Sequence, residues 1–144
     1  MILGHRVKES GENAGIIITK DYGEIPHIAC YAGQMNQVFM NILVNAIDAL
    51  EEDKTQNAEI MISTACQAEY LTITITDNGP GITDDIQHKI FDPFFTTKGV
   101  GKGTGMGMAI SYQIVVDKHH GQLTCSSSPE NGTKFTIRLP LTHL

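Results

Sequence analysis

The chain has 144 residues, of which 41% are hydrophobic and 18% charged, and its formal net charge is −6. A chain of this length buries roughly two-thirds of its unfolded surface in one core, so we expect a single globular domain that needs no disulfide or structural metal. The acidic balance argues against a nucleic-acid partner, and no apolar run reaches the roughly 20 residues of a membrane span, so we expect no direct membrane contact.

The cysteines and histidines show no ligand spacing. Cys30, Cys66 and Cys125 are scattered, odd in number and form no C-x-x-C motif. We therefore expect reduced, buried thiols that pack as small hydrophobic side chains, which is typical of a cytoplasmic protein.

The first elements in chain order are short. Residues 1–12 are polar and weakly patterned and are interpreted as a tail or linker from a preceding part of a longer protein, with the domain proper at 13–144. Two β-branched runs, at 14–20 and 27–31, predict strands, and good helix formers from 34 to 52 predict a long helix.

Two strand pairs and two further helices follow. The strands at 58–66 and 69–77 should form an antiparallel hairpin, a short helix is expected at 84–90 and another at 109–120, and a second hairpin should join 122–127 to 133–139. This order predicts a two-layer α/β sandwich, with a mixed, largely antiparallel sheet of about five strands covered on one face by about three helices. The irregular stretch 77–107 is too long for a simple connection and should be a lid or binding segment.

The long helix carries a narrow polar stripe on an otherwise apolar surface. Its members are Gln34, Gln37, Asn41, Asn45 and Asp48. Short amides in place of Lys and Glu indicate that the stripe lines a cavity, although a partly exposed polar surface remains an alternative. Amide oxygens together with substrate phosphates suit Mg²⁺.

Asp77-Asn78-Gly79-Pro80-Gly81-Ile82 follows the second strand of the first hairpin. Its glycines allow a sharp turn and a close approach to a ligand, and the Asp77 carboxylate can accept a hydrogen bond from an exocyclic amine. Asp-Asn-Gly is also ordinary turn chemistry, which stays open as the alternative.

A second glycine-rich segment, 99–107, runs directly into the helix at 109–120. Unhindered backbone amides at a helix N-terminus favour phosphate, whereas a flexible linker is the alternative. Lys98 and Lys102 are the nearby cations that would neutralise a phosphate. Three phenylalanines, Phe91, Phe94 and Phe95, lie just before this segment and alone predict a small satellite core.

Taken together, these segments resemble the ATP-binding catalytic domain of two-component sensor histidine kinases, within the group that includes gyrase-type, mismatch-repair and chaperone ATPases. NILVNAIDAL is similar to that family's N box, DNGPGI and GKGTGMGMAI to its two glycine boxes, and FDPFFTTK to its F box. The resemblance covers residues 14–141, and four boxes in the family order are far more specific than any one of them.

The resemblance implies a role for each matching residue. Asn45 would ligate Mg²⁺ bridging the phosphates of ATP, Asn41 would face the same cavity as a second catalytic residue, and Asp77 would recognise the adenine amine. The remaining nucleotide contacts implied are Gly79, Gly81 and Ile82 around the adenine, Lys98, Gly101, Lys102, Gly103, Thr104, Gly105, Met106 and Gly107 in a lid near the phosphates, and Thr133 beside Asp77. The phenylalanines of the F box would pack the lid and form part of a docking surface.

The resemblance also implies transfer of the γ-phosphoryl group to a histidine on a separate dimerisation domain, with a response regulator receiver domain downstream. Hydrolytic relatives have Glu where this chain has Asn41, so ATP hydrolysis should be slow. Several kinases have a basic residue where this chain has Asp48, which leaves phosphate neutralisation to the two lysines and Mg²⁺. His5 lacks the acidic neighbour of an acceptor histidine.

The isolated chain is therefore expected to be a monomer that binds ATP without autophosphorylating, whereas the parent protein would be a homodimer, whether or not it is anchored to a membrane. Two alternatives belong to other classes. One is an ATP-driven conformational switch of the gyrase, mismatch-repair or chaperone type, and the other is a degenerate domain that serves only for protein interaction.

Overall fold

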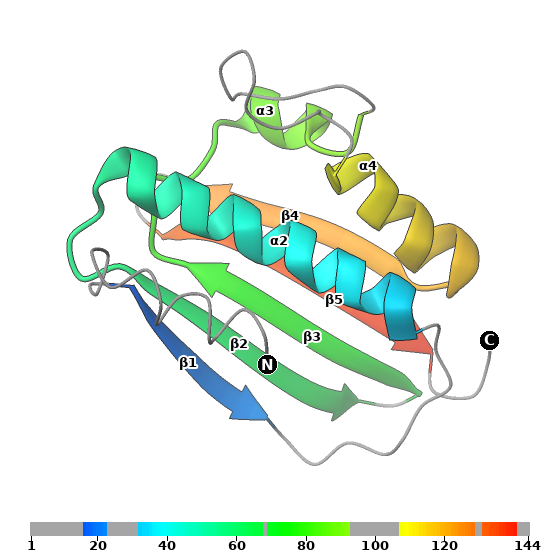
Figure 1. Ribbon diagram of the computed structural model, residues 1–144. Helices are drawn as coiled ribbons and strands as arrows, with labels where there is room; N and C mark the ends of the chain where they lie inside the picture. The colour runs from blue at the N-terminus through cyan, green and yellow to red at the C-terminus, as the bar shows by residue number, and fades with distance from the viewer. Residues whose placement is uncertain (1–15, 23–31, 68, 93–106, 129–130, 141–144) are drawn as a thin grey trace.

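The computed structural model describes residues 16–22, 32–67, 69–92, 107–128 and 131–140, and shows a sheet with helices on one face (Figure 1). The predicted two-layer α/β sandwich with a mixed sheet is confirmed. The expected tail at 1–12 and strand at 27–31 lie outside the described residues. The elements run in the order β1 (Ile17–Tyr22), α2 (Ala32–Asp53), β2 (Glu59–Gln67), β3 (Tyr70–Asp77), α3 (Asp84–Lys89), α4 (Gly107–Tyr112), η2 (Gln113–Lys118), β4 (Gln122–Ser128) and β5 (Gly132–Pro140).

The sheet joins the two predicted hairpins side by side in the strand order β1-β2-β3-β5-β4. Both hairpins are antiparallel, as is the long-range pairing between β3 and β5, whereas β1 pairs with β2 in parallel. The β3–β5 pairing sets Asp77 directly opposite Thr133. Two residues from distant parts of the sequence therefore meet at one end of the sheet.

The core lies between the sheet and α2. Alternate residues of β3 and β5 face the helices, and α2 contributes its apolar side. Burying one leucine or isoleucine side chain stabilises the fold by roughly 1.5–3 kcal/mol. The largest contributors include Ile42, Leu43, Leu50, Ile60 and Ile137, each no more than 2% exposed. Met40, in the same helix, is 37% exposed, so the apolar circumference of α2 is not buried on every side.

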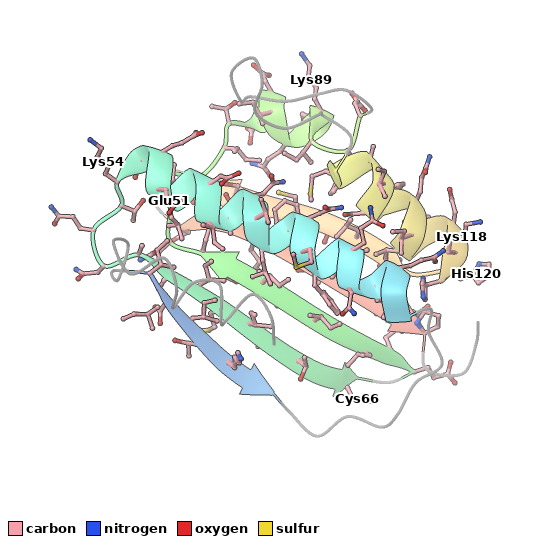
Figure 2. All side chains as sticks on the ribbon, in the orientation of Figure 1. Glu51, Lys54, Cys66, Lys89, Lys118 and His120 are labelled. Carbon is pink, nitrogen blue, oxygen red and sulfur yellow. The ribbon has the colours of Figure 1, made fainter. Side chains whose placement is uncertain are left out.

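The prediction that the cysteines are buried is wrong for Cys66, which is exposed, and Cys125 is only partly buried. Cys66 pairs with Leu71 of β3, which is 3% exposed. Figure 2 shows Cys66 at the end of β2, away from helix α2. At this end of the sheet, therefore, Leu71 of β3 is covered whereas Cys66 of β2 is not.

The second long helix begins at Gly107, two residues before the predicted start, and changes character midway. From Gln113 to Lys118 it continues as the π-helical segment η2, and His120 ends it in the left-handed conformation with φ 57°. The wider π-helical turn places His119 inside the fold, at 2% exposure, with its ring Nδ1 2.9 Å from the Ile114 carbonyl oxygen.

Candidate functional site

Helix α2 brings the two glycine-rich segments together. At its middle, Asn41 contacts Gly107, the first residue of α4. Toward its end, Leu50 Cδ2 lies 3.3 Å from the position that a Cβ on Gly79 would occupy, so α2 also packs against the loop after β3. Asn45 lies between these two contacts, about 6 Å along the helix axis from Asn41 and on the same side. The candidate site therefore comprises the residues of α2 that lie between the start of α4 and the end of β3, with the residues they contact there.

The Asp77 carboxylate sits at the end of β3 and is 5% exposed. Its Oδ1 accepts a hydrogen bond of 2.8 Å from the Gly79 amide, and the Thr133 amide donates a further one to the carboxylate. Burial raises the pKa of Asp77 above its ordinary 3.8, and the two amide hydrogen bonds oppose part of that rise. A buried, oriented acceptor of this kind recognises a ligand donor strongly, because a mismatched ligand leaves it unpaired.

The loop after Asp77 turns back toward the second hairpin. Gly81 has φ 73°, a conformation that costs a residue with a side chain about 1–2 kcal/mol and glycine almost nothing. The turn aims the Ile82 amide at Ser127 Oγ on β4, 2.8 Å away. A local glycine requirement in the sequence therefore controls a contact with a strand 45 residues further on.

Ser127 is a site residue that sequence reasoning missed. Besides Ile82, its hydroxyl contacts the Gly132 carbonyl oxygen and Thr133 Oγ1, each at 3.0 Å. Gln87 of α3 adds a hydrogen bond from Nε2 to the Ser127 carbonyl oxygen at 3.0 Å. The signal in the sequence was alternation: Ser127 is in phase with Leu123 and Cys125, so it is a polar residue on the inward face of β4.

Asn41 uses its amide nitrogen to hold the start of α4. Nδ2 donates to the Gly107 carbonyl oxygen at 3.0 Å and to Ser111 Oγ at 3.1 Å, and Ser111 donates in turn to the same carbonyl at 2.9 Å. Ser111 is fully buried and was also missed from the sequence. Both amide hydrogens are thereby engaged, which leaves the side-chain oxygen of Asn41 as its group able to face a ligand.

The residues of the polar stripe on α2 differ in how far they are exposed to solvent. Asn41, Asn45 and Asp48 are half-buried, whereas Gln37 is exposed. Gln34 Oε1 is buried and has no hydrogen-bond partner among the residues that the structure describes. The half-buried part of the stripe is therefore the part that runs past the site.

Phe91, the described phenylalanine of the F-box segment, packs into an aromatic group. Its ring centroid lies 5.3 Å from that of Tyr112 on α4 and 6.4 Å from that of Phe135 on β5. Edge and tilted pairs of this kind are favourable beyond the area they bury. They tie the end of α3 to α4 and to the sheet.

Several predicted site residues lie outside the described residues. These are Lys98, Gly101, Lys102, Gly103, Thr104, Gly105 and Met106, together with Phe94 and Phe95. Within the described ranges, no group of three or more His, Cys, Asp or Glu residues is placed to hold a metal ion. An Asn ligand such as Asn45 would therefore depend on phosphate and water oxygens to complete the coordination of Mg²⁺.

Cys125 lies near the Asp77 carboxylate and is half-buried. Burial raises the pKa of its thiol to about 11, and the negative charge of Asp77 acts in the same direction. The thiolate is the reactive form, so Cys125 should react slowly with thiol reagents despite its place beside the site.

We expect Cys125 to react at least about tenfold more slowly than exposed Cys66 with a disulfide reagent at pH 8. Two variants isolate the thiols: Cys30→Ser with Cys66→Ser, and Cys30→Ser with Cys125→Ser. The rates are measured by absorbance, and the same variants in denaturant serve as the control, since unfolding should make the two rates similar. Equal rates in the folded proteins would contradict the expected burial of Cys125.

Comparison with known proteins assigns the family. Residues 31–143 match the family model described as histidine kinase-, DNA gyrase B-, and HSP90-like ATPase. The match covers far more than half of the chain, and the chain therefore belongs to this family. Membership in this family implies ATP binding. Separately, no helix of the described segments is both long and apolar enough to cross a membrane.

Similar sequences are sensor kinases. The chain is 42% identical over 108 residues to the signal transduction histidine-protein kinase AtoS of Escherichia coli, which covers 74% of this chain and 17% of the relative. It is 37% identical over 118 residues to sporulation kinase E of Bacillus subtilis, covering 82% of this chain and 15% of the relative. The chain thus spans less than a fifth of the length of these two proteins.

Similar structures are histidine kinase catalytic domains. The catalytic domain of histidine kinase ThkA matches with a TM-score of 0.80 at 28% identity, covering 95% of this chain and 86% of that one. ThkA in complex with the response regulator TrrA matches with a TM-score of 0.74 at 26% identity, covering 96% of this chain and 38% of that one. The chain is accordingly a histidine kinase ATPase domain of the sensor-kinase type.

Proposed function

We propose that this chain binds ATP with Mg²⁺ and transfers the γ-phosphoryl group to a histidine on a separate dimerisation domain of the same parent protein. That histidine would then pass the phosphoryl group to the receiver domain of a response regulator. The observation that carries the proposal is the buried Asp77 carboxylate, held by the amides of Gly79 and Thr133 at the end of β3. An acceptor in this position suits the 6-amino group of adenine. The relatives and the ThkA–TrrA structure support the two partners proposed.

The asparagines of α2 would serve the phosphates. Asn45 would ligate Mg²⁺ through its side-chain oxygen, and Mg²⁺ would neutralise charge as the phosphoryl group is transferred. Asn41 would offer its oxygen to the same region while its nitrogen holds Gly107 at the start of α4. Gly79, Gly81, Ile82 and Thr133 would shape the adenine end of the pocket.

The lid would close on the phosphates from the glycine-rich segment that precedes α4. Backbone amides of Gly101, Gly103, Thr104, Gly105 and Met106, with Gly107 at the helix start, would surround them. Lys98 and Lys102 would add positive charge there. Phosphoryl transfer would then rest on positioning and electrostatic stabilisation, with the acceptor imidazole as nucleophile.

An ATP-driven conformational switch is the second candidate, because the matched family includes such ATPases. It requires a group that accepts a proton from water, and the Asn41 amide cannot do so, because an amide oxygen is far too weakly basic. Steady ATP turnover by the isolated chain would favour this second function. Failure to bind any adenine nucleotide would favour a domain used only for protein interaction.

Replacement of Asn45 by alanine should lower the affinity for ATP in the presence of Mg²⁺ by about tenfold or more, because the ion loses its protein oxygen ligand. The affinity without Mg²⁺ should change little. Titration calorimetry with ATP, with and without Mg²⁺, measures the effect. Asn36→Ala is the matched control, since Asn36 is an exposed asparagine of the same helix. Unchanged magnesium dependence in Asn45→Ala would remove Asn45 from the proposed metal site.

A further inference from the structure

The hydroxyl of Ser127 has three polar neighbours, which is as many hydrogen bonds as it can form. The Ile82 amide lies 2.8 Å away, the Gly132 carbonyl oxygen 3.0 Å and Thr133 Oγ1 3.0 Å. A serine hydroxyl supplies one hydrogen and two lone pairs. The position of every hydrogen in this group can therefore be assigned by counting.

The count orients the Thr133 hydroxyl. The Gly132 carbonyl has no hydrogen, so its contact with Ser127 requires the single hydrogen of the serine. The Ile82 amide occupies one lone pair of Ser127. The contact with Thr133 then requires the hydrogen of the threonine, which leaves Thr133 Oγ1 with lone pairs alone for any other partner.

Thr133 lies beside Asp77, which is also an acceptor. The two residues are directly paired across β3 and β5, and both are no more than 9% exposed. In the ionised form, Asp77 offers only lone pairs, and it already receives the Gly79 amide. The pair therefore presents an edge that accepts hydrogen bonds and donates none.

We propose that Ser127 is a positioning residue for base selectivity: by accepting the Thr133 hydrogen, it keeps this edge acceptor-only and selects a 6-aminopurine over a 6-oxopurine. The inference rests on the proposed adenine site. Adenine brings an amino group with two hydrogens, whereas hypoxanthine and guanine bring a carbonyl oxygen at the same position. The oxo group would face the acceptor oxygens of Asp77 and Thr133, either directly or through one bound water. It would then be repelled or left without a hydrogen-bond donor.

The surroundings hold Ser127 in this orientation. Gln87 of α3 donates to the Ser127 carbonyl oxygen at 3.0 Å, and the Ile82 carbonyl oxygen lies 3.4 Å from the same Gln87 nitrogen. Gly132 belongs to the turn end of the same hairpin, where Ser128 pairs with it. Ser127 thus joins three parts of the fold: its carbonyl oxygen contacts α3, and its hydroxyl contacts the loop after β3 and the turn end of the β4–β5 hairpin.

The test compares the affinities of ADP and inosine diphosphate, which differ in the group at position 6 of the purine and in the hydrogen that the 6-oxopurine carries on N1. In Ser127→Ala the Thr133 hydrogen loses its acceptor and becomes available to an oxo group, so the preference for ADP should fall about fivefold, the effect of one hydrogen bond. Ser127→Thr retains a hydroxyl and should restore the preference. A loss of affinity shared equally by both nucleotides would show a structural role alone and would overturn the proposal.

A double-mutant cycle tests whether Ser127 affects the nucleotide preference through the hydroxyl of Thr133. Thr133→Val should itself reduce the preference for ADP, and Ser127→Ala should then cause no further change in the ratio. An equal effect of Ser127→Ala with and without Thr133→Val would refute this role of Thr133. Unchanged preference in Thr133→Val would also refute it, even if Ser127→Ala by itself proved too unstable to measure. A wild-type chain that binds neither nucleotide would instead refute the proposed function, and the inference with it.

Discussion

Replacement of Asp77 by asparagine should lower the affinity for ATP by about a hundredfold or more, the largest functional effect expected of any single change in the described residues. The carboxylate accepts hydrogen bonds from the amides of Gly79 and Thr133 and, in the proposed complex, from the adenine amine. An asparagine has one acceptor oxygen, so its NH₂ group must face either a backbone amide or the amine. Calorimetric titration with ATP measures the loss.

Asp117→Asn provides the control for charge, because Asp117 is an exposed carboxylate on η2 and is not among the residues proposed for the site. Its affinity for ATP should equal that of the wild type. Circular dichroism of both variants checks that each remains folded. Wild-type affinity in a folded Asp77→Asn variant would show that the adenine lies elsewhere.

The same substitution gives a pH dependence of known sign. Burial raises the pKa of Asp77 in the folded chain above its ordinary 3.8, so between these two pKa values the folded state holds a proton that the unfolded state has released. The contribution of Asp77 to stability is therefore complete below pH 3.8 and is lost as the pH rises through the folded pKa. The free energy of unfolding of Asp77→Asn, relative to the wild type, should accordingly rise from acid to neutral pH in denaturant titrations.

Gly132→Ala should destabilise the fold by about 3 kcal/mol or more, the largest stability effect that we expect. Gly132 has φ 77°, and a Cβ there would lie 2.0 Å from the Asp77 carbonyl oxygen and 3.0 Å from the Asn78 Cα. These neighbours are backbone atoms of β3 and of the residue that follows it, and they cannot rotate away as a side chain could. Chemical denaturation, monitored by circular dichroism, measures the loss.

Gly33→Ala is the matched control, since a Cβ on this exposed glycine at the start of α2 meets none of the described residues within 4 Å. Alanine has the higher helix propensity, so this variant should be more stable by up to about 1 kcal/mol. The two substitutions are chemically identical and should change stability in opposite directions. A similar small effect of both would mean that β3 and β5 do not meet at Gly132 as closely as described.

The two hairpins and helix α2 follow from local sequence alone. Alternating Thr with Leu and Ile in 71–76 marks a strand, because a strand places successive side chains on opposite faces, and the glycine-rich break at 78–81 ends it. The break at 129–132 marks the turn of the second hairpin. The run of helix formers after Ala32 likewise defines α2, and its Asn41 and Asn45 share one side because they are four residues apart. Asp77 was identifiable as a candidate acceptor because it ends a strand before a glycine-rich turn.

The tertiary structure alone decided which of these groups meet. The pairing of β3 with β5 sets Thr133 against Asp77, and the second hairpin then brings Ser127 to both Thr133 and the Ile82 amide. In the same way, the packing of α4 against α2 engages the Asn41 amide with Gly107, where the sequence predicted only a residue facing the cavity. Side-chain periodicity is a short-range property of the backbone, whereas hydrogen-bond partners depend on contacts between segments tens of residues apart, which no local pattern encodes.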